Sequence, residues 1–471
     1  MKFNQWTVGL AAVGLVSLGA VAEEAQHEVM TALSSTTISG YVNTSAILRF
    51  GGGTMSPGRS FDGASKQNGF NLDVVKLQIE KPLDESDNWA AGYNIGLLFG
   101  PDANVYGTTS TKLSDVVATH ASKEVWPQVE DLLSSLGDLI GGWDGWDDGE
   151  DYDGPSLHSG LPSPGAVVSA LQNTLGRVND PHFQALAQGT SDFGIKEANV
   201  VLRAPIGNGL DFKIGYWESP IGYEVFDAGN NPNYSRSFGY YIEPKQFTGI
   251  LAAYRVSKVI QVAAGIANQG WALLPGAGGN TVVHIPMNGI NSRPGLDSLK
   301  TYMASIAITA PESAGFLKGA TLYGGIIDSS VYRGPDVINY YVGGTMPTPI
   351  ENVLLGACFD YRGNGSGEGF SSSHASAIAG YAIWKATDKL RLNGRVEYAT
   401  GSNNTWYYFS NGDSNELLGV TATVDYNLWA NVLTRLEFRW DHDITGNGMF
   451  NDIDDPDENA VSLALNVIYK F

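Results

Sequence analysis

Apolar and polar residues alternate with a period of two through most of this sequence, most clearly in its last segment, residues 459–471. One set of alternate positions there is entirely apolar: Val461, Leu463, Leu465, Val467, Tyr469 and Phe471. The other set contains Ser462, Asn466 and Lys470. Successive side chains of a β-strand point to opposite faces, so this segment is predicted to be a strand with two different surroundings. Such strands occur in soluble sheets and in membrane walls that separate lipid from a polar lumen.

Segments of strand length that carry this alternation recur along the chain. The sixteen predicted strands are residues 37–49, 70–80, 89–99, 195–204, 210–217, 247–256, 259–268, 300–309, 320–328, 337–345, 352–361, 375–385, 389–399, 416–426, 432–441 and 460–471. Their connections alternate between short turns and long loops, as in an antiparallel membrane barrel with its turns on the periplasmic side. Trp89, Trp384 and Trp429 lie beside short turns, where the aromatic girdle of a membrane interface is expected.

The start of the sequence predicts export. Lys2, an apolar run over residues 8–21 and the Ala20-Val21-Ala22 cleavage pattern indicate a secretory signal peptide at residues 1–22. The alternative, an N-terminal membrane helix, is disfavoured because the run is shorter than the ~20 residues that such a helix needs. No later stretch reaches that length, so this chain can cross a membrane only as a closed barrel. We therefore expect a periplasmic segment at 23–36 and the barrel at 37–471.

The composition supports the barrel over a soluble two-sheet sandwich or propeller. The chain has 58 Gly, 22 Tyr and 11 Trp but only 16% charged residues, which is little for a soluble protein of 471 residues. A net charge of −21 argues against nucleic acid as a partner. The single Cys358 excludes an internal disulfide and a cysteine metal site. Phosphate-binding loops and the G-x-S-x-G elbow are absent, so no catalytic residue is expected.

Three stretches resemble a known family. They are GFNLDVVKLQIEKPLD at 69–84, NIGLLFGPDAN at 94–104, and the segment 196–254 that begins KEANVVLRAPIGNG. They are similar to the OmpL-like putative β-barrel porin family of Gram-negative outer membranes. The resemblance implies an outer-membrane location, passive diffusion of small hydrophilic solutes or ions, and no catalysis. It also implies contact with outer-membrane lipid and lipopolysaccharide and with the barrel-assembly machinery, and it leaves homo-oligomerisation open. The terminal aromatic residue Phe471 resembles the signal that this machinery reads.

The lumen-facing positions of two predicted strands are rich in charge. Arg391, Arg395, Arg435 and Arg439, which we call the arginine wall, alternate with Glu397 and Glu437. Small residues on the strand between them leave room for the guanidinium groups. Arg203, Lys213 and Arg255 are further inward cations by parity. Two compatible roles follow, ion selectivity in a wet lumen and a cross-strand ion-pair network that braces the wall.

A long insertion, residues 100–194, separates the third and fourth predicted strands and contains two helix-like stretches. Within 111–192 there are thirteen acidic residues against three basic ones, and the densest group is Asp144, Asp147, Asp148, Glu150, Asp151 and Asp153. We expect the insertion to fold into the mouth opposite the arginine wall, where it would create a transverse electric field. The alternative is an external acidic surface, which would suit a binding or adhesion barrel. An outer-membrane enzyme is a further alternative with no supporting motif.

One loop has a loose calcium-binding spacing. Asp441, Asp443, Thr445 and Asp452 occupy the first, third, fifth and twelfth positions of an EF-hand-like series, with Gly446 at the sixth. The flanking segments are a strand and a loop rather than helices, and the last ligand would be Asp instead of Glu. No cofactor is assigned, and Ca²⁺ is kept as an alternative at this loop and at the acidic group of the insertion.

Overall fold

The computed structural model describes residues 36–50, 68–83, 89–106, 193–268, 299–331, 335–366, 372–402, 406, 416–446, 448, 450 and 457–471. By its contacts the chain divides into two units, residues 1–108 with 191–471 and residues 109–190. All described residues belong to the first unit. The predicted signal peptide, most of the periplasmic segment 23–36 and nearly all of the insertion therefore lie outside the described residues, and those predictions stay untested.

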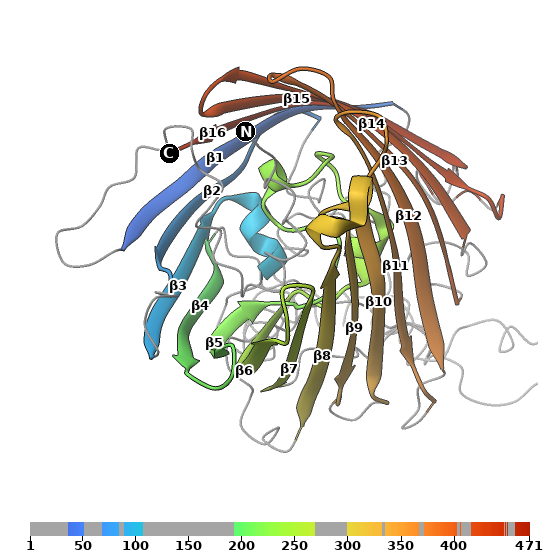
Figure 1. Ribbon diagram of the computed structural model, residues 1–471. Coiled ribbons are helices and arrows are strands. Elements are labelled where there is room, and N and C mark those ends of the chain that lie inside the picture. The colour runs from blue at the N-terminus through green and yellow to red at the C-terminus, as the bar shows by residue number, and fades with distance from the viewer. Residues whose placement is uncertain are drawn as a thin grey trace, which may run out of the picture. The chain divides into compact units, whose positions relative to one another are not determined.

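Sixteen strands form the first unit (Figure 1). They are β1 (Thr37–Phe50), β2 (Gly69–Lys81), β3 (Ala90–Phe99), β4 (Phe193–Ala204), β5 (Leu210–Glu218), β6 (Gln246–Arg255), β7 (Ile260–Asn268), β8 (Lys300–Thr309), β9 (Thr321–Ser329), β10 (Val337–Pro347), β11 (Val353–Asn364), β12 (Ser373–Lys385), β13 (Leu390–Gly401), β14 (Glu416–Trp429), β15 (Val432–Asp443) and β16 (Asn459–Lys470). Each overlaps one predicted strand, and the ends agree to within three residues. Every strand pairs with its sequence neighbour to make a closed barrel, so the predicted fold class is confirmed.

The last strand closes the barrel on the first. Tyr41 of β1 is opposite Lys470, and Phe50 is opposite Val461. Gly40 and Phe471 exchange two backbone hydrogen bonds, of 2.8 and 3.0 Å. The closing segment therefore pairs on both sides, with β1 and with β15, and leaves no strand edge unpaired.

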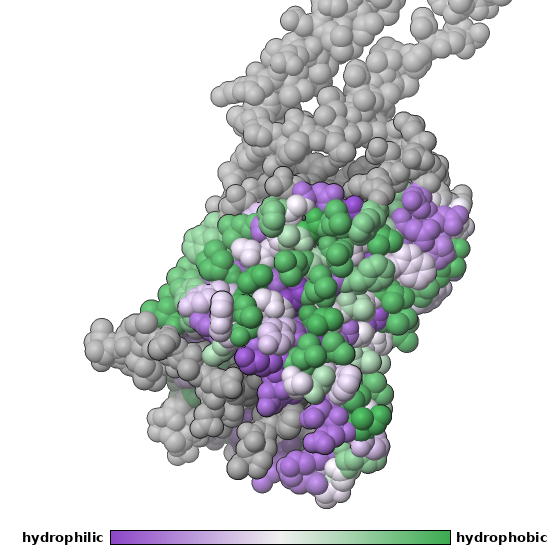
Figure 2. Space-filling view, turned by 90° about the horizontal axis from the view of Figure 1, so that it is seen from above, coloured by the Kyte–Doolittle hydropathy of each residue, from purple (hydrophilic) through white to green (hydrophobic). Residues whose placement is uncertain are grey.

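The two faces of each strand differ as the alternation predicts. In β16, Leu465 and Tyr469 are 49% and 48% exposed, whereas Asn466 between them is fully buried on the lumen side. Figure 2 shows hydrophobic residues spread over an outer face of the barrel, with hydrophilic residues gathered mainly toward its margins. Such an apolar outer band is what a lipid-facing wall requires. Within the described residues, no helix is long and apolar enough to cross a membrane.

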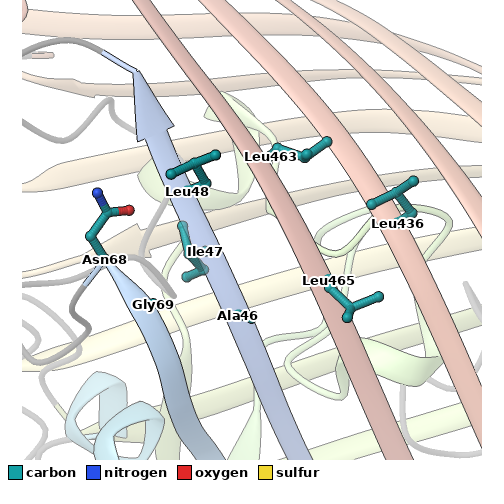
Figure 3. A pocket seen from close by; sticks show the side chains of 8 residues that line it. All are labelled: Ala46, Ile47, Leu48, Asn68, Gly69, Leu436, Leu463 and Leu465. Carbon is teal, nitrogen blue, oxygen red and sulfur yellow. The ribbon is translucent and has the colours of Figure 1, made fainter.

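An apolar groove of about 440 Å³ runs over the outer face where β1 closes on β16 (Figure 3). Leucine side chains from β1, β15 and β16 stand along it, and Asn68 marks one end. Its lining is Ala46, Ile47, Leu48, Asn68, Gly69, Leu436, Leu463 and Leu465. The groove belongs to the lipid-facing surface rather than to the lumen.

Two β-bulges place extra side chains inside the barrel. The pairing of β1 with β2 shifts register at Asp73, and the pairing of β3 with β4 shifts at Lys196. An extra residue in one strand re-aims the side chains around it. As a result Asp73 and Val74 are consecutive yet both buried, and so are Lys196 and Glu197. Strict alternation could not predict either pair.

Candidate functional site

The connection between β5 and β6, residues 219–245, folds into the barrel, and we call it the lumen loop (Figure 1). Its base is held by a 2.8 Å hydrogen bond from Ser219 N to Lys245 O. It contains a short 3-10 turn, η5 (Ala228–Asn230), and one turn of helix, α6 (Phe238–Ile242). Ser237 caps α6 by accepting a hydrogen bond from Tyr240 N. Almost every residue of the loop is buried or half-buried, which is unusual for a connection between strands.

Two polar side chains hold the lumen loop in its own shape. The Arg236 guanidinium donates to the carbonyl oxygens of Val225, Phe226 and Tyr234 at 3.0, 2.6 and 2.6 Å. The Asn231 amide accepts from Val225 N at 2.8 Å and donates to Val225 O at 2.6 Å. A compact loop without regular structure has many unpaired backbone groups, and these side chains satisfy several of them.

The arginine wall lies against this loop. Arg395 of β13 and Arg439 of β15 are both opposite Thr421 of β14, whose small side chain leaves space between them. Arg395 is 1% exposed, and it contacts Glu224 of the loop at 2.9 Å and Glu397 of its own strand at 2.9 Å. As the sequence predicts, Arg395 and Arg439 face the lumen, and the strand between them has a small side chain at the facing position.

The same arginines also bind backbone carbonyl groups of the loop. Arg439 donates to Arg236 O at 2.6 Å. Arg435 donates to Ala228 O and Asn231 O at 2.5 and 2.7 Å. Both arginines are 1% exposed. Five fixed N–H donors allow a guanidinium to bind several oxygens at once, which suits it to holding a loop.

Acidic groups of the wall complement the loop's N–H groups. Glu437 accepts from Tyr234 N at 2.5 Å and from Ser235 N at 2.9 Å. Glu397 accepts from Phe238 N at 2.6 Å. Because charge-assisted hydrogen bonds are stronger than neutral ones, this side of the lumen fixes the loop in a defined position. Ion pairs join Arg395 and Arg439 to Glu397, and Arg391 and Arg435 to Asp425. The bracing and selectivity roles of these residues both stay predictions.

A second part of the barrel wall, formed by β1, β2 and β4, holds the loop through Asp227. Its carboxylate accepts from Tyr41 Oη and Lys76 Nζ, both at 2.9 Å, and lies 3.6 Å from Lys196 Nζ. Burial alone would raise the pKa of Asp227, but the two ammonium groups outweigh burial and hold that pKa well below its ordinary value. Asp73, at the first bulge, likewise accepts a 3.2 Å hydrogen bond from Tyr234 of the loop. Both bulge residues thus contact the lumen loop.

The remaining predicted cations lie apart from the loop or only touch it. Arg391 donates to Asp425, and its side chain is 26% exposed. Arg203 pairs with Asp211 at 2.6 Å, Lys213 is buried on the lumen face, and Arg255 is exposed at the short-turn end of β6. Arg391 shares Asp425 with Arg435 and so stays part of the arginine wall, whereas Arg203, Lys213 and Arg255 lie on β4, β5 and β6.

The lumen loop is a part of the site that the strand pattern does not predict. By that pattern residues 218–246 are one of several long connections, and the acidic insertion is the segment expected to enter the mouth. The acidic residues Asp144 to Asp153 lie outside the described residues, so that expectation stays a prediction. A signal for the lumen loop existed in its apolar and aromatic content, including Phe226, Tyr234 and Phe238, which an exposed loop would not need.

The calcium alternative gains no support from the described residues. Asp441 is bound by Arg439 at 2.9 Å, and Asp443 accepts from Thr445 N at 3.0 Å. Asp452 lies outside the part of the chain that the structure describes. Within that part, no group of three or more His, Cys, Asp or Glu side chains could hold a metal ion.

Solved structures with low sequence identity, one of them an outer-membrane channel, have a similar fold. The outer membrane channel DcaP of Acinetobacter baumannii is 10% identical, with a TM-score of 0.50 over 93% of this chain and 97% of that chain. OprB of Pseudomonas putida is 9% identical, with a TM-score of 0.50 over 92% and 93%. OmpT of Vibrio cholerae in its trimer form is 10% identical, with a TM-score of 0.47 over 93% and 99%. No curated protein matches the sequence.

The family comparison is more specific than the fold. The family model described as putative beta-barrel porin-2, OmpL-like, matches residues 168–471, which include β4 to β16 and the whole lumen loop. This match covers more than half of the chain, and it agrees with the closed barrel and its apolar outer band. The chain therefore belongs to the OmpL-like putative beta-barrel porin-2 family of the outer membrane.

Proposed function

We propose that this porin conducts small hydrophilic solutes or ions passively and that the lumen loop determines what passes. The observation that carries the proposal is the double attachment of the loop, to the arginine wall on one side and to Tyr41, Lys76 and Lys196 on the other. A loop fixed on two sides of a lumen narrows it to a defined shape. Catalysis is no part of the proposal, since channels of this family need only a shaped and charged path.

Ion preference in this proposal depends on the charged side chains that water reaches. The side chains of Arg391 and Glu218 are 26% and 27% exposed, whereas that of Arg395 is fully buried. A permeating ion therefore meets Arg391 before it meets the buried arginines. The selectivity role predicted for the whole arginine wall is accordingly narrowed to Arg391, and the buried members are assigned to holding the loop.

Planar-bilayer recordings test this proposal. The wild-type protein should form stable channels, and Arg391→Glu should move the reversal potential in a salt gradient toward cation preference. Lys318→Glu is the matched control, because Lys318 has the same charge but lies in the β8–β9 turn with 56% of its side chain exposed. A folded barrel that passes no current would overturn the proposal and favour a surface-binding role. An equal shift in the control would remove Arg391 as the selective group.

The proposal also includes the partners of the barrel. Its apolar outer face suits outer-membrane lipid and lipopolysaccharide, and Phe471 is the residue expected to be read by the barrel-assembly machinery. Homo-oligomerisation is a further expectation, which cross-linking in native membranes would check.

A further inference from the structure

A second contact between the lumen loop and the wall consists of two acidic groups. Glu243, the residue that follows α6, and Asp360 of β11 are 5% and 2% exposed, and their carboxyl groups contact each other. We call them the acid pair. Neither carboxylate oxygen of Asp360 receives a hydrogen bond. Two ionised carboxylates have no hydrogen to share and repel each other when buried, so the arrangement calls for a proton between them.

The acid pair is enclosed by glycines of the lumen loop. A side chain at Gly239 would begin 2.2 Å from Asp360 Oδ2, and one at Gly222 would begin 2.5 Å from Glu243 Oε2. Both distances are shorter than real Cβ contacts, so any larger residue at either position would have to displace a carboxyl group of the pair. Gly222 also has a φ of +125°, which favours glycine at that position. The enclosure keeps water from the pair while the loop is docked.

The charges around the pair do not neutralise two carboxylates. Lys245 Nζ lies 3.8 Å from Glu243, while the nearby Glu224 is already bound by Arg395. Burial lowers the pKa of Lys245 to about 8, although the carboxylates oppose it, so Lys245 stays mostly charged below that pH. The groups that face the pair are Glu224, Lys245, Tyr223 and Tyr240 from the loop, Tyr341 from β10 and Cys358 from β11. Lys245 is thus the ammonium group that faces the two carboxyls, and Glu243 also accepts a hydrogen bond from the backbone N–H of Tyr223.

The direction of the pH dependence follows from Glu243. Burial raises its pKa to about 7 from an ordinary 4.5, although Lys245 opposes the shift. A group whose pKa is raised in the docked state favours docking fully below its ordinary pKa. That contribution is lost as the pH rises through about 7. Between about pH 4.5 and pH 7 the ratio of docked to undocked loop would change by up to about 300-fold, because each unit of pKa is a factor of ten.

We propose that the acid pair is a proton-operated latch that holds the lumen loop against β11 in acid and releases it at neutral to alkaline pH. The inference rests on the proposed function, since it assigns a regulation to the same loop. One proton bridges Glu243 and Asp360 when the loop is docked, and its loss leaves two facing carboxylates that separate. The channel therefore conducts less at pH 5 than at pH 8.

Single-channel conductance between pH 5 and pH 8 tests the latch. Wild-type conductance should rise with pH, with a midpoint near 7. Glu243→Gln and Asp360→Asn supply an uncharged donor at all pH values, so each should keep the low conductance and lose the rise. Asp388→Asn is the matched control, because Asp388 lies in the β12–β13 turn with its side chain 99% exposed, and it should retain the rise.

Two results would overturn the latch. One is a conductance that does not change with pH in the wild type, and the other is a rise that persists in both Glu243→Gln and Asp360→Asn. The heat-modifiable gel mobility of each variant confirms that its barrel has folded. Absence of current from every folded variant at every pH would instead contradict the proposed channel function, so the two failures are distinguishable.

Discussion

The lumen has two walls of different chemistry. The lumen face of β13, β14 and β15 carries the buried arginines and their carboxylates, whereas the lumen face of β6 to β9 is mostly apolar, with Gln246, Thr301 and Ser329 at its ends. We call the second face the apolar wall; its buried apolar residues are Phe247, Leu251, Ala253, Ala263, Ala267, Met303, Ala307, Tyr323 and Ile327. On both sides the lipid-facing residues are similar, for example Ile250 at 37% and Leu436 at 48% exposure.

The two walls hold the same loop by different kinds of interaction. Against the arginine wall the lumen loop is held by directional bonds that specify its position. Toward the apolar wall it packs by shape: the backbone at Gly325 leaves room for Ile221, and a side chain there would begin 2.4 Å from it. The apolar wall behaves like the core of a soluble protein, and its residues join Ile221 in one cluster. Mutations on the two walls should therefore differ in kind.

The largest effect is expected on the arginine wall. Arg395→Met would leave Glu224 and Glu397 buried without their shared cation, which should destabilise the barrel by about 3–5 kcal/mol. Urea unfolding and channel noise would both report the loss. Arg391→Met, at a partly exposed position on the same strand, should cost about 1 kcal/mol or less. Equal losses for the two variants would show that burial does not determine the strength of the wall.

On the apolar wall, Leu251→Ala should reduce stability by about 3 kcal/mol through the cavity that it leaves. Ion preference should not change, because no charge is lost. Ile250→Ala is the control, since the neighbouring side chain faces lipid and should lose less. Urea unfolding measures the stability and the reversal potential measures the ion preference. A changed reversal potential in Leu251→Ala would contradict the division between the two walls.

A smaller effect is expected where the loop presses closest on β14. A side chain at Gly419 would begin 2.7 Å from Glu397 and 3.1 Å from the ring of Phe238, so Gly419→Ala should cost about 1–3 kcal/mol. Gly394→Ala on the neighbouring strand meets nothing within 4 Å and should be nearly neutral. Comparing thermal unfolding of the two variants sharpens the claim that the loop is packed tightly against this wall.

The smallest effect concerns the Asp227 attachment. Because its pKa is lowered in the docked loop, Asp227 stabilises docking above its ordinary pKa of 3.8, and the contribution is lost as the pH falls below that value. The change should be about 1 kcal/mol, because pH 3 lies less than one unit below that ordinary pKa and only the first part of the contribution is lost there. Thermal unfolding at pH 3 and pH 5 should differ less in Asp227→Asn than in the wild type. The acid pair responds in the opposite direction, so docking is strongest between about pH 4 and pH 5 and weakens as the pH rises toward 7.

The pattern of the sequence predicts the barrel and the arginine side of the site, but it does not predict the loop that fills the lumen. A period of two over sixteen segments determines strands, faces and closure, and Arg395, Arg435 and Arg439 point inward as their parity predicts. Parity cannot say what fills the lumen, because the contacts of the lumen loop join residues more than a hundred positions apart, as between Glu224 and Arg395. It also fails at Asp73 and Lys196, where bulges reverse the alternation.

The measurement that tests the central claim most directly is the conductance of a barrel without its lumen loop. Residues 221–243 would be replaced by two glycines, which keeps the hydrogen bond between Ser219 and Lys245 at the base. The released arginines would then be hydrated in the lumen. We predict a conductance several-fold higher than that of the wild type, without the rise between pH 5 and pH 8. A folded variant with wild-type conductance would show that the loop does not control the channel.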